Sequence, residues 1–259
     1  VRGRTRAAVA RDVPHGVLVL FPAYAALHPS VRRWEERAAD GSPTIMERLG
    51  RHKLVVVEPR DRNALTAAVE SFRSHVAMSE RTGIGGAMLF AVCRGRLSEG
   101  VDFADAAARG VVITGLPLPP YHDPKVQLKR QYLDERARGR SSKDEHISGA
   151  EWYDQQAMRA INQAIGRVIR HVRDFGVVLL CEARFRQPKY VGYLSHWLQP
   201  HVRQFDHFGQ LIQALPRFFK LIDPSLQPTQ KREESDERRK ELALPKEPAP
   251  LETLAWPER

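Results

Sequence analysis

Five short, uninterrupted apolar runs divide the first two thirds of the chain into regular intervals. They occupy Gly16–Phe21, Lys53–Glu58, Ala87–Val92, Gly110–Thr114 and Gly176–Leu180. Because these runs are continuous rather than alternating, they predict strands that are buried on both faces of a sheet.

Amphipathic segments lie between and after these runs. Within Asn63–Met78, the apolar residues Leu65, Val69, Phe72 and Val76 recur at helical spacing and form one stripe. A second helix is expected over about 206–222, where apolar residues again gather on one side. Strands that alternate with helices need crossover connections, so the fold class predicted is α/β, a doubly wound parallel sheet with helices on both faces.

The same pattern suggests how the chain is organised. We expect an N-terminal stub over residues 1–12, a domain over 13–222, and a charged, proline-containing tail over 223–259 that is disordered or a linker. The polar and basic segment Gly139–His146 is expected to be an exposed loop. Because the chain does not begin with Met and starts abruptly, we expect it to be a piece of a longer protein.

Composition excludes some classes of protein and indicates the kind of partner. With 42% hydrophobic residues in a chain of 259, wholesale disorder is excluded. The longest apolar run, Gly16–Leu27, contains Pro22 and falls short of the roughly 20 residues that span a bilayer, so no membrane partner is expected. The formal net charge of +10 favours an anionic partner, with nucleic acid first.

A helix with two arginines is the strongest local signal. It is expected to start at Ser148, which can cap the amide of Glu151, and to run through the sequence Gln163-Ala-Ile-Gly-Arg167-Val-Ile-Arg170. At about 100° per residue, Gln163, Arg167 and Arg170 then share one face within about 60°. Guanidinium forks suit phosphate oxygens, and Gly166 would let a ligand approach the backbone. The alternative is an ordinary solvated basic face.

A glycine-punctuated loop follows the run Ala87–Val92. It reads Arg94-Gly-Arg-Leu-Ser98-Glu99-Gly100-Val-Asp102-Phe103. The carboxyl end of a parallel strand is where open α/β sheets bind ligands, and these carboxylates could orient a ribose, a metal-bound water or the neighbouring arginines. The alternative is an ordinary turn between a strand and a helix.

Together these two segments resemble motifs V and VI of superfamily 2 helicases of the xeroderma pigmentosum group D type. Val13–Tyr24 is similar to the motif IV region that opens that family's second motor lobe, and Thr114–Pro120 followed by Asp123-Pro-Lys resembles the stretch after motif V. Segments around Glu151–Tyr153 and His201–Arg203 are most similar to the branch of the family that regulates telomere elongation. Leu128–Tyr132 leans towards the Fanconi anaemia group J branch.

The resemblance implies the second RecA-like motor lobe of an ATP-dependent DNA helicase that moves 5′ to 3′ in the nucleus, in DNA repair, recombination or telomere maintenance. ATP with Mg²⁺ would be shared with a first lobe, which carries the P-loop, the acidic box and a 4Fe–4S domain in that family. The chain contains no Gly-x-x-x-x-Gly-Lys-Ser/Thr, and its two cysteines, Cys93 and Cys181, are expected to be buried hydrophobes. The isolated chain is therefore expected to be inactive, with DNA (single strands and unwinding junctions) and the missing lobe as partners.

Residue roles implied by the resemblance follow its motifs. Arg170 resembles the arginine finger, Arg167 its partner on the γ-phosphate, and Gln163 a hydrogen-bonding group near the nucleotide or the attacking water. Gly166 and Gly100 belong to the ATP-binding motifs, and Glu99 and Asp102 would link the nucleotide site to the DNA track. Arg94 and Ser98 are candidate contacts to the DNA backbone.

Two further readings stay open. Trp152 and Tyr153 could stack on single-stranded bases, although packing is the simpler role for such aromatic residues. No histidine cluster with metal-ligand spacing occurs, so no metal site is assigned.

The competing function is a non-catalytic nucleic-acid-binding module that keeps the fold without the motor, and the intact arginine pair argues against it.

Overall fold

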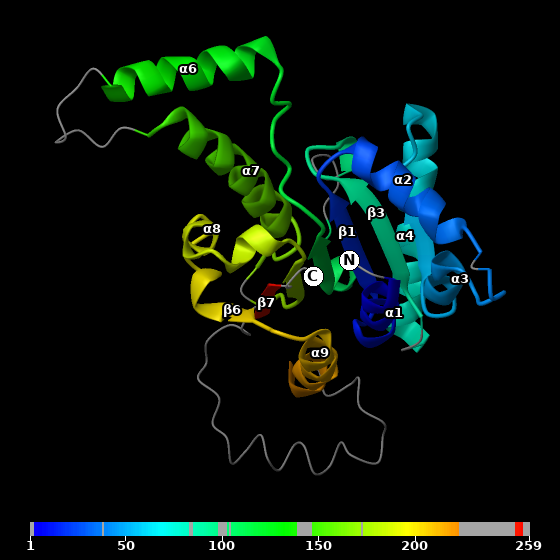
Figure 1. Cartoon of the computed structure of the whole chain (residues 1–259). Helices are drawn as coiled ribbons and strands as arrows, with labels where there is room; N and C mark the ends of the chain where they lie inside the picture. The colour runs from blue at the N-terminus through cyan, green and yellow to red at the C-terminus, as the bar shows by residue number, and fades with distance from the viewer. Residues whose placement is uncertain are drawn as a thin grey trace, which may run out of the picture.

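A computed structural model of the chain describes residues 3–37, 39–82, 85–97, 103, 105–138, 147–171, 173–222 and 252–255. Seven described strands form one parallel sheet in the order β2-β3-β1-β4-β5-β7-β6 (Figure 1). Their bounds are β1 Gly16–Phe21, β2 Leu54–Val57, β3 Ala87–Val92, β4 Gly110–Ile113, β5 Val177–Leu180, β6 Val202–Gln204 and β7 Glu252–Ala255. All five strands expected from the apolar runs are confirmed.

Helices connect the strands and cover both faces of the sheet. They are α1 Gly3–Asp12, α2 Tyr24–Glu35, α3 Ile45–Gly50, α4 Arg62–Thr82, α6 Pro124–Arg138, α7 Gly149–Gly166, α8 Pro188–Gly192 and α9 Phe208–Ile222. Short 3-10 turns are η1 Asp105–Ala108, η2 Ala183–Arg186 and η3 Gln199–His201. The α4 and α9 helices confirm the two amphipathic segments predicted from the sequence.

Alternate residues of the central strand β1 feed two separate cores. Leu18 and Leu20 pack with Phe72 of α4 and Ile161 of α7 in one apolar cluster. Val17, Val19 and Phe21 pack on the other side with residues of α1, α2, α3 and α9, including Leu27, Trp34, Leu49 and Leu215. Because a strand presents successive side chains to opposite faces, two helical layers enclose the sheet, and the doubly wound α/β prediction is confirmed.

The residues expected to form a stub fold as helix α1. Val9 and Ala10 of this helix, with Val13 after it, are at most 2% exposed and belong to the second core cluster. Polar residues outnumber apolar ones in the helix, which hid its short buried stripe. In the expected tail, Glu252–Ala255 forms β7 between β5 and β6, and 223–251 and 256–259 lie outside the described residues.

Helix α6 stands away from the sheet and forms a hairpin with α7, whose second half packs on the sheet (Figure 1). No residue of α6 is buried, and its described contacts with the rest of the protein run mainly to α7. The amide of Gly149 donates to Asp134 Oδ1 over 2.7 Å, which joins the two helices near the hairpin tip. The expected loop Gly139–His146 lies outside the described residues. Among the helices that are described, none is both long and apolar enough to cross a membrane.

Candidate nucleotide-facing site

Helix α7 begins as predicted but ends earlier. Ser148 Oγ accepts from the amide of Glu151 over 3.1 Å, which confirms the N-cap, and the Glu151 carboxylate accepts from Tyr193. The helix stops at Gly166, so Arg167 is its C-cap and Arg170 lies in the following loop. The expectation of one continuous helical face through Arg170 is wrong. Glycine favours a helix end, and the amide of Arg170 finds an acceptor outside the helix.

The predicted residues nevertheless converge on one pocket. Its volume is about 700 Å³, and its lining includes Gln163, Gly166, Arg167, Arg170 and Arg94. Gln163 and Arg170 are exposed and Arg167 is half-buried. A side chain added at Gly166 would meet nothing within 4 Å, so the backbone there faces open space. Three guanidinium groups around one hollow suit an anion with several oxygens, such as a polyphosphate.

Arg94 comes from the other predicted segment, directly after β3. It adopts a φ of 61°, an uncommon left-handed conformation for a residue with a side chain, and donates from Nη2 to the carbonyl of Gln156 in α7. This bond fixes the start of the loop against the helix that carries Gln163. Arg94 therefore lines the same pocket as the arginine pair rather than a separate surface.

The rest of the glycine-punctuated loop is mostly outside the described residues. That part contains Ser98, Glu99, Gly100 and Asp102, so their roles stay predictions. Its described end, Phe103, is 2% exposed and packs edge-on against Phe72 with ring centroids 5.9 Å apart. The amide of Phe103 donates to the carbonyl of Arg167 over 3.4 Å. The two segments singled out from the sequence are thus joined through the backbone.

A buried acid behind the loop was missed by the sequence reasoning. Asp174, just before β5, is 3% exposed and accepts from the amide of Arg170, while Arg109 at the start of β4 is its ion-pair partner at 2.8 Å. An acidic residue before a strand is common in turns, so its sequence carries no distinguishing signal. Only the fold shows that Asp174 contacts the loop that carries Arg170.

Glu58 is a second missed residue, at the opposite end of the sheet. It is 1% exposed and accepts from the Tyr24 hydroxyl over 2.9 Å and from the amide of Val92 over 2.8 Å. Burial, and then the bond to Glu58, raise the pKa of the Tyr24 phenol. Glu58 therefore ties β2, β3 and the start of α2 together immediately before the Arg94 loop.

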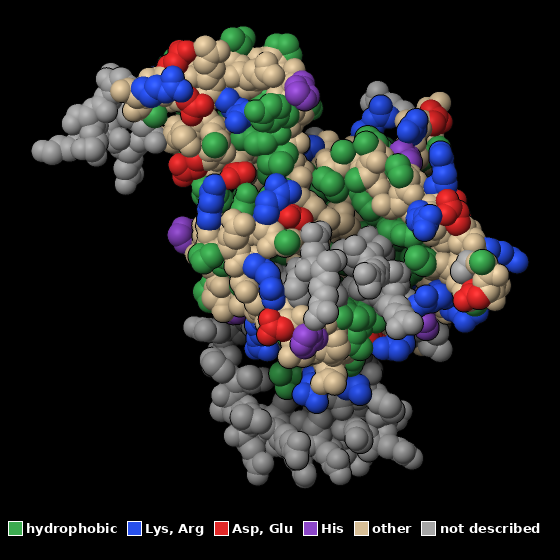
Figure 2. Space-filling model, viewed as in Figure 1, with side chains coloured by type: hydrophobic (Ala, Val, Ile, Leu, Met, Phe, Trp, Pro, Cys, Tyr) green, Lys and Arg blue, Asp and Glu red, His purple; other side chains and the backbone are tan. Residues whose placement is uncertain are grey.

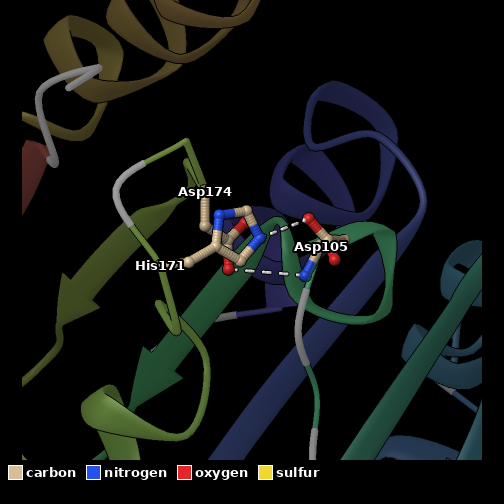
Figure 3. A group of neighbouring side chains, drawn as sticks. All are labelled: Asp105, His171 and Asp174. Atoms are coloured by element: carbon tan, nitrogen blue, oxygen red, sulfur yellow. Dashed lines mark hydrogen bonds and ion pairs between the residues drawn. The ribbon is translucent and has the colours of Figure 1, made fainter.

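Three side chains capable of binding a metal lie close together beside the loop that carries Arg170. Asp105, His171 and Asp174 place one ligand atom each within 4.8 Å, and His171 Nε2 lies 3.0 Å from Asp105 Oδ1 (Figure 3). Both Asp174 oxygens already accept protein donors, including the Arg109 guanidinium. A cation would have to compete with that guanidinium, so we assign the cluster to internal hydrogen bonding.

The aromatic candidates lie in the first two turns of α7. Tyr153 donates its hydroxyl to the carbonyl of Pro119 over 2.7 Å, and its ring lies edge-on to Tyr121 and 5.2 Å from the Arg130 guanidinium. Burial is the main cause that raises its phenol pKa. Trp152 is half-buried. Tyr153 thus has a packing role here, and base stacking by either residue stays a prediction.

The remaining features bear on charge and redox chemistry. Cys93 and Cys181 are free and buried, and burial raises the pKa of the Cys93 thiol to about 12, as fits inert core residues. Lys and Arg side chains are spread among acidic ones over the face drawn in Figure 2, not gathered into one patch. The net positive charge alone therefore does not mark a nucleic-acid track on this face.

Two comparisons with known proteins bear on the family of this chain. Residues 7–201 match the helicase C-terminal domain family. The chain is 42% identical over 214 residues to the regulator of telomere elongation helicase 1 homolog of Oryza sativa subsp. japonica, covering 82% of this chain and 21% of that protein. It is 43% identical over 224 residues to the Bos taurus regulator of telomere elongation helicase 1, covering 86% of this chain and 18% of that protein. The chain thus spans about a fifth of the length of these relatives.

Proposed function

Because the chain belongs to the helicase C-terminal domain family, we propose that it acts as the second motor lobe of an ATP-dependent DNA helicase. Membership confirms the predicted RecA-like fold class, and the similarity to regulators of telomere elongation helicase confirms the predicted branch. The observation that carries the functional proposal is the convergence of Arg94, Arg167, Arg170 and Gln163 on one pocket.

The donor set of this pocket fits the phosphates of ATP. Its described lining contains guanidinium and amide groups and no carboxylate, so it offers ligands for phosphate oxygens but none that Mg²⁺ prefers. Magnesium would be held by the first lobe and by ATP itself. Arg167, partly buried at the helix end, would hold the γ-phosphate. Gln163 would hydrogen-bond near the nucleotide or the attacking water.

Arg170 is proposed as the arginine finger. Its guanidinium would neutralise charge that develops on the transferred phosphoryl group, an effect worth ~10³–10⁵ in rate in other phosphoryl-transfer systems. Its position in a loop held by Asp174, with an exposed side chain, lets it reach across a cleft to ATP bound on another lobe. Glu99, Asp102 and Gly100 are proposed to couple this site to the DNA track, with Ser98 near the DNA backbone. Arg94, for which the resemblance implies a DNA contact, is proposed instead as a pocket residue, because it lines the same hollow as Arg167 and Arg170.

The proposal extends to the parent protein through its relatives. From the name of these relatives, we propose a nuclear role in telomere maintenance for the parent protein. DNA repair or recombination and 5′ to 3′ movement are proposed from the resemblance of its motifs to the wider helicase family. A 4Fe–4S cluster is proposed for the parent protein alone, because two buried cysteines, one after β3 and one after β5, cannot supply its ligands here. Single-stranded DNA and unwinding junctions are the proposed partners, together with the first lobe.

The test is single-stranded-DNA-stimulated ATP hydrolysis by this chain, alone and mixed with the amino-terminal half of a family member. We expect no hydrolysis alone and hydrolysis on mixing. Arg170→Ala should lower kcat of the mixture by about 10³-fold or more while DNA binding, followed by fluorescence anisotropy, stays unchanged. Arg159→Ala, at an exposed arginine of α7 outside the pocket lining, is the matched control and should keep full activity.

Two results would contradict the proposal. Hydrolysis by the chain alone would mean that it holds a complete phosphate site and is not half of a motor. Equal kcat in the Arg170→Ala and Arg159→Ala mixtures would remove Arg170 from the finger role. The non-catalytic alternative predicts DNA binding without any gain of hydrolysis on mixing.

A further inference from the structure

Both oxygens of the Asp174 carboxylate accept hydrogen bonds, and the donors come from three parts of the chain. Oδ1 accepts from Arg109 Nη1 over 2.8 Å and from the amide of Phe175 over 2.9 Å. Oδ2 accepts from the amide of Arg170 over 3.2 Å and from the amide of Asp105 over 3.4 Å. An ionised carboxylate offers about four lone-pair sites, so each site has one donor. A buried polar group satisfied in this way defines one local geometry.

Arg109 provides the charge that makes this buried acid stable. Its side chain is 11% exposed, and it donates from Nη1 to the carbonyl of Phe175 over 2.8 Å as well as to Asp174. Its guanidinium carbon lies 3.8 Å from the centre of the Phe175 ring. The backbone of Arg109 is fixed too, because its amide donates to Gly16 and its carbonyl accepts from Val177. The pair is therefore anchored at the amino ends of β1, β4 and β5.

Asp174 connects this rigid edge of the sheet to two loops. One is the turn after α7, where the last bond back to the helix comes from the amide of Ile169 to the carbonyl of Ile165. The next residue is Arg170, whose amide turns to Asp174 instead. The other begins at Asp105, the first residue of η1, which follows the glycine-punctuated loop and holds a left-handed φ of 56°. Figure 3 shows Asp105 beside His171 and Asp174. Asp105 also contacts His171 of the first loop.

We propose that Asp174, held by Arg109, is a positioning residue that sets the backbone of Arg170 relative to the pocket and to Asp105, the residue that begins η1 after the glycine-punctuated loop. The inference rests on the proposed role of Arg170, since it explains how a finger on an irregular loop keeps a fixed approach. Asp174 itself touches no reacting group. A purely stabilising acid would need no bonds to the amides of the two loops that carry the candidate residues.

Asp174→Asn tests the inference, because the amide keeps the size of the side chain but replaces one acceptor oxygen with a donor. In the mixed ATPase assay, we expect kcat to fall by about 10–100-fold, as a small misplacement of a catalytic group can cause. KM for ATP should change by less than about twofold, since the finger acts in the transition state. Arg109→Lys, which keeps the charge but loses the fork, should lower kcat by a smaller factor with the same KM.

A stability control separates positioning from folding. Val9→Ala, in helix α1 and the second core cluster, should lower the melting temperature while it leaves every hydrogen bond to Asp174 in place, so its kcat should equal that of the unaltered chain. Hydrogen exchange gives a readout that needs neither ATP nor the first lobe. In the Asp174→Asn chain, the amide of Arg170 should exchange faster than in the unaltered chain, while the amides of α4 stay protected.

The outcomes distinguish the two proposals. Unchanged kcat in both Asp174→Asn and Arg109→Lys, with Arg170→Ala inactive, overturns the positioning role and leaves the finger. A loss of kcat in Val9→Ala equal to that in Asp174→Asn also overturns it. Full activity in Arg170→Ala instead removes the finger, whereas faster exchange of the Arg170 amide would still show that Asp174 holds the loop.

Discussion

The buried Glu58 carboxylate offers a prediction whose size follows from its partners. Glu58→Ala leaves the amide of Val92, in a fully buried strand, and the half-buried Tyr24 hydroxyl without their acceptor. An unsatisfied buried donor costs about 1–3 kcal/mol, and the Tyr24 hydroxyl can recover part of its loss from water. We therefore expect the free energy of unfolding to fall by about 2–4 kcal/mol, a large share of the ~5–15 kcal/mol of a typical domain.

Urea unfolding of this chain, followed by circular dichroism, measures the change as a shift in midpoint at constant slope. Glu58→Gln keeps one acceptor oxygen, so its loss should be about half as large. Glu70→Ala, at an exposed position of α4, is the matched control and should stay within about 0.5 kcal/mol of the unaltered chain. The reasoning is refuted if Glu58→Ala is as stable as Glu70→Ala.

The same residue makes a spectroscopic prediction. Because the Glu58 carboxylate contributes, after burial, to the raised pKa of Tyr24, Glu58→Gln should lower the pH at which that phenol ionises. Ultraviolet titration, with Tyr24→Phe as the reference that lacks the signal, measures the shift. An unchanged titration would mean that burial alone sets the pKa.

Two further predictions concern stability. Lys53 donates to the carbonyl of His15, and burial lowers its pKa from 10.5 to about 7. The unfolded chain therefore binds a proton that the folded chain lacks between these values, so stability should rise with pH from about 7 towards 10.5 by up to ~1.4 kcal/mol per unit. Urea unfolding at pH 7 and 9 should show this rise in the free energy of unfolding, and Lys53→Met should lose it. If the unaltered chain and Lys53→Met gain the same stability between these pH values, the prediction is wrong. Gly16→Ala places Cβ 2.0 Å from the Ala107 carbonyl oxygen and should destabilise by about 3 kcal/mol by the same assay. Gly192→Ala, with nothing within 4 Å, is its control, and equal stability of the two variants would show that the backbone yields.

The strands could be predicted because each is buried on both faces and so reads as one apolar run. Ala87–Val92 is the clearest case, with expected and observed bounds identical. The order of strands could not be predicted, since β1 lies between β3 and β4 through contacts distant in sequence. Periodicity also failed at the end of α7, where Ile165, Val168 and Ile169 continue an apolar pattern beyond the helix. Val168 stays buried there, in a turn, so burial alone did not require a helix.

The sequence predicted which residues line the pocket better than it predicted how they are arranged. Gln163, Arg167 and Arg170 were found through residue type and spacing, and they line one pocket although Arg170 leaves the helix. Asp174 and Glu58 were missed because a buried acid is recognised by its donors, and those donors are backbone amides from distant segments. No pattern of side chains along the chain records them.

Helix α1 changes where a shortened version of this lobe can safely be cut. It packs against α3 and α9, and its buried residues Val9 and Ala10 belong to the cluster that contains Leu49 and Phe219. A recombinant fragment started at Val13, where the motif resemblance begins, would leave that apolar surface open to water. Such a surface invites self-association during expression. The practical boundary for making soluble protein therefore lies before α1, several residues upstream of the first recognisable motif.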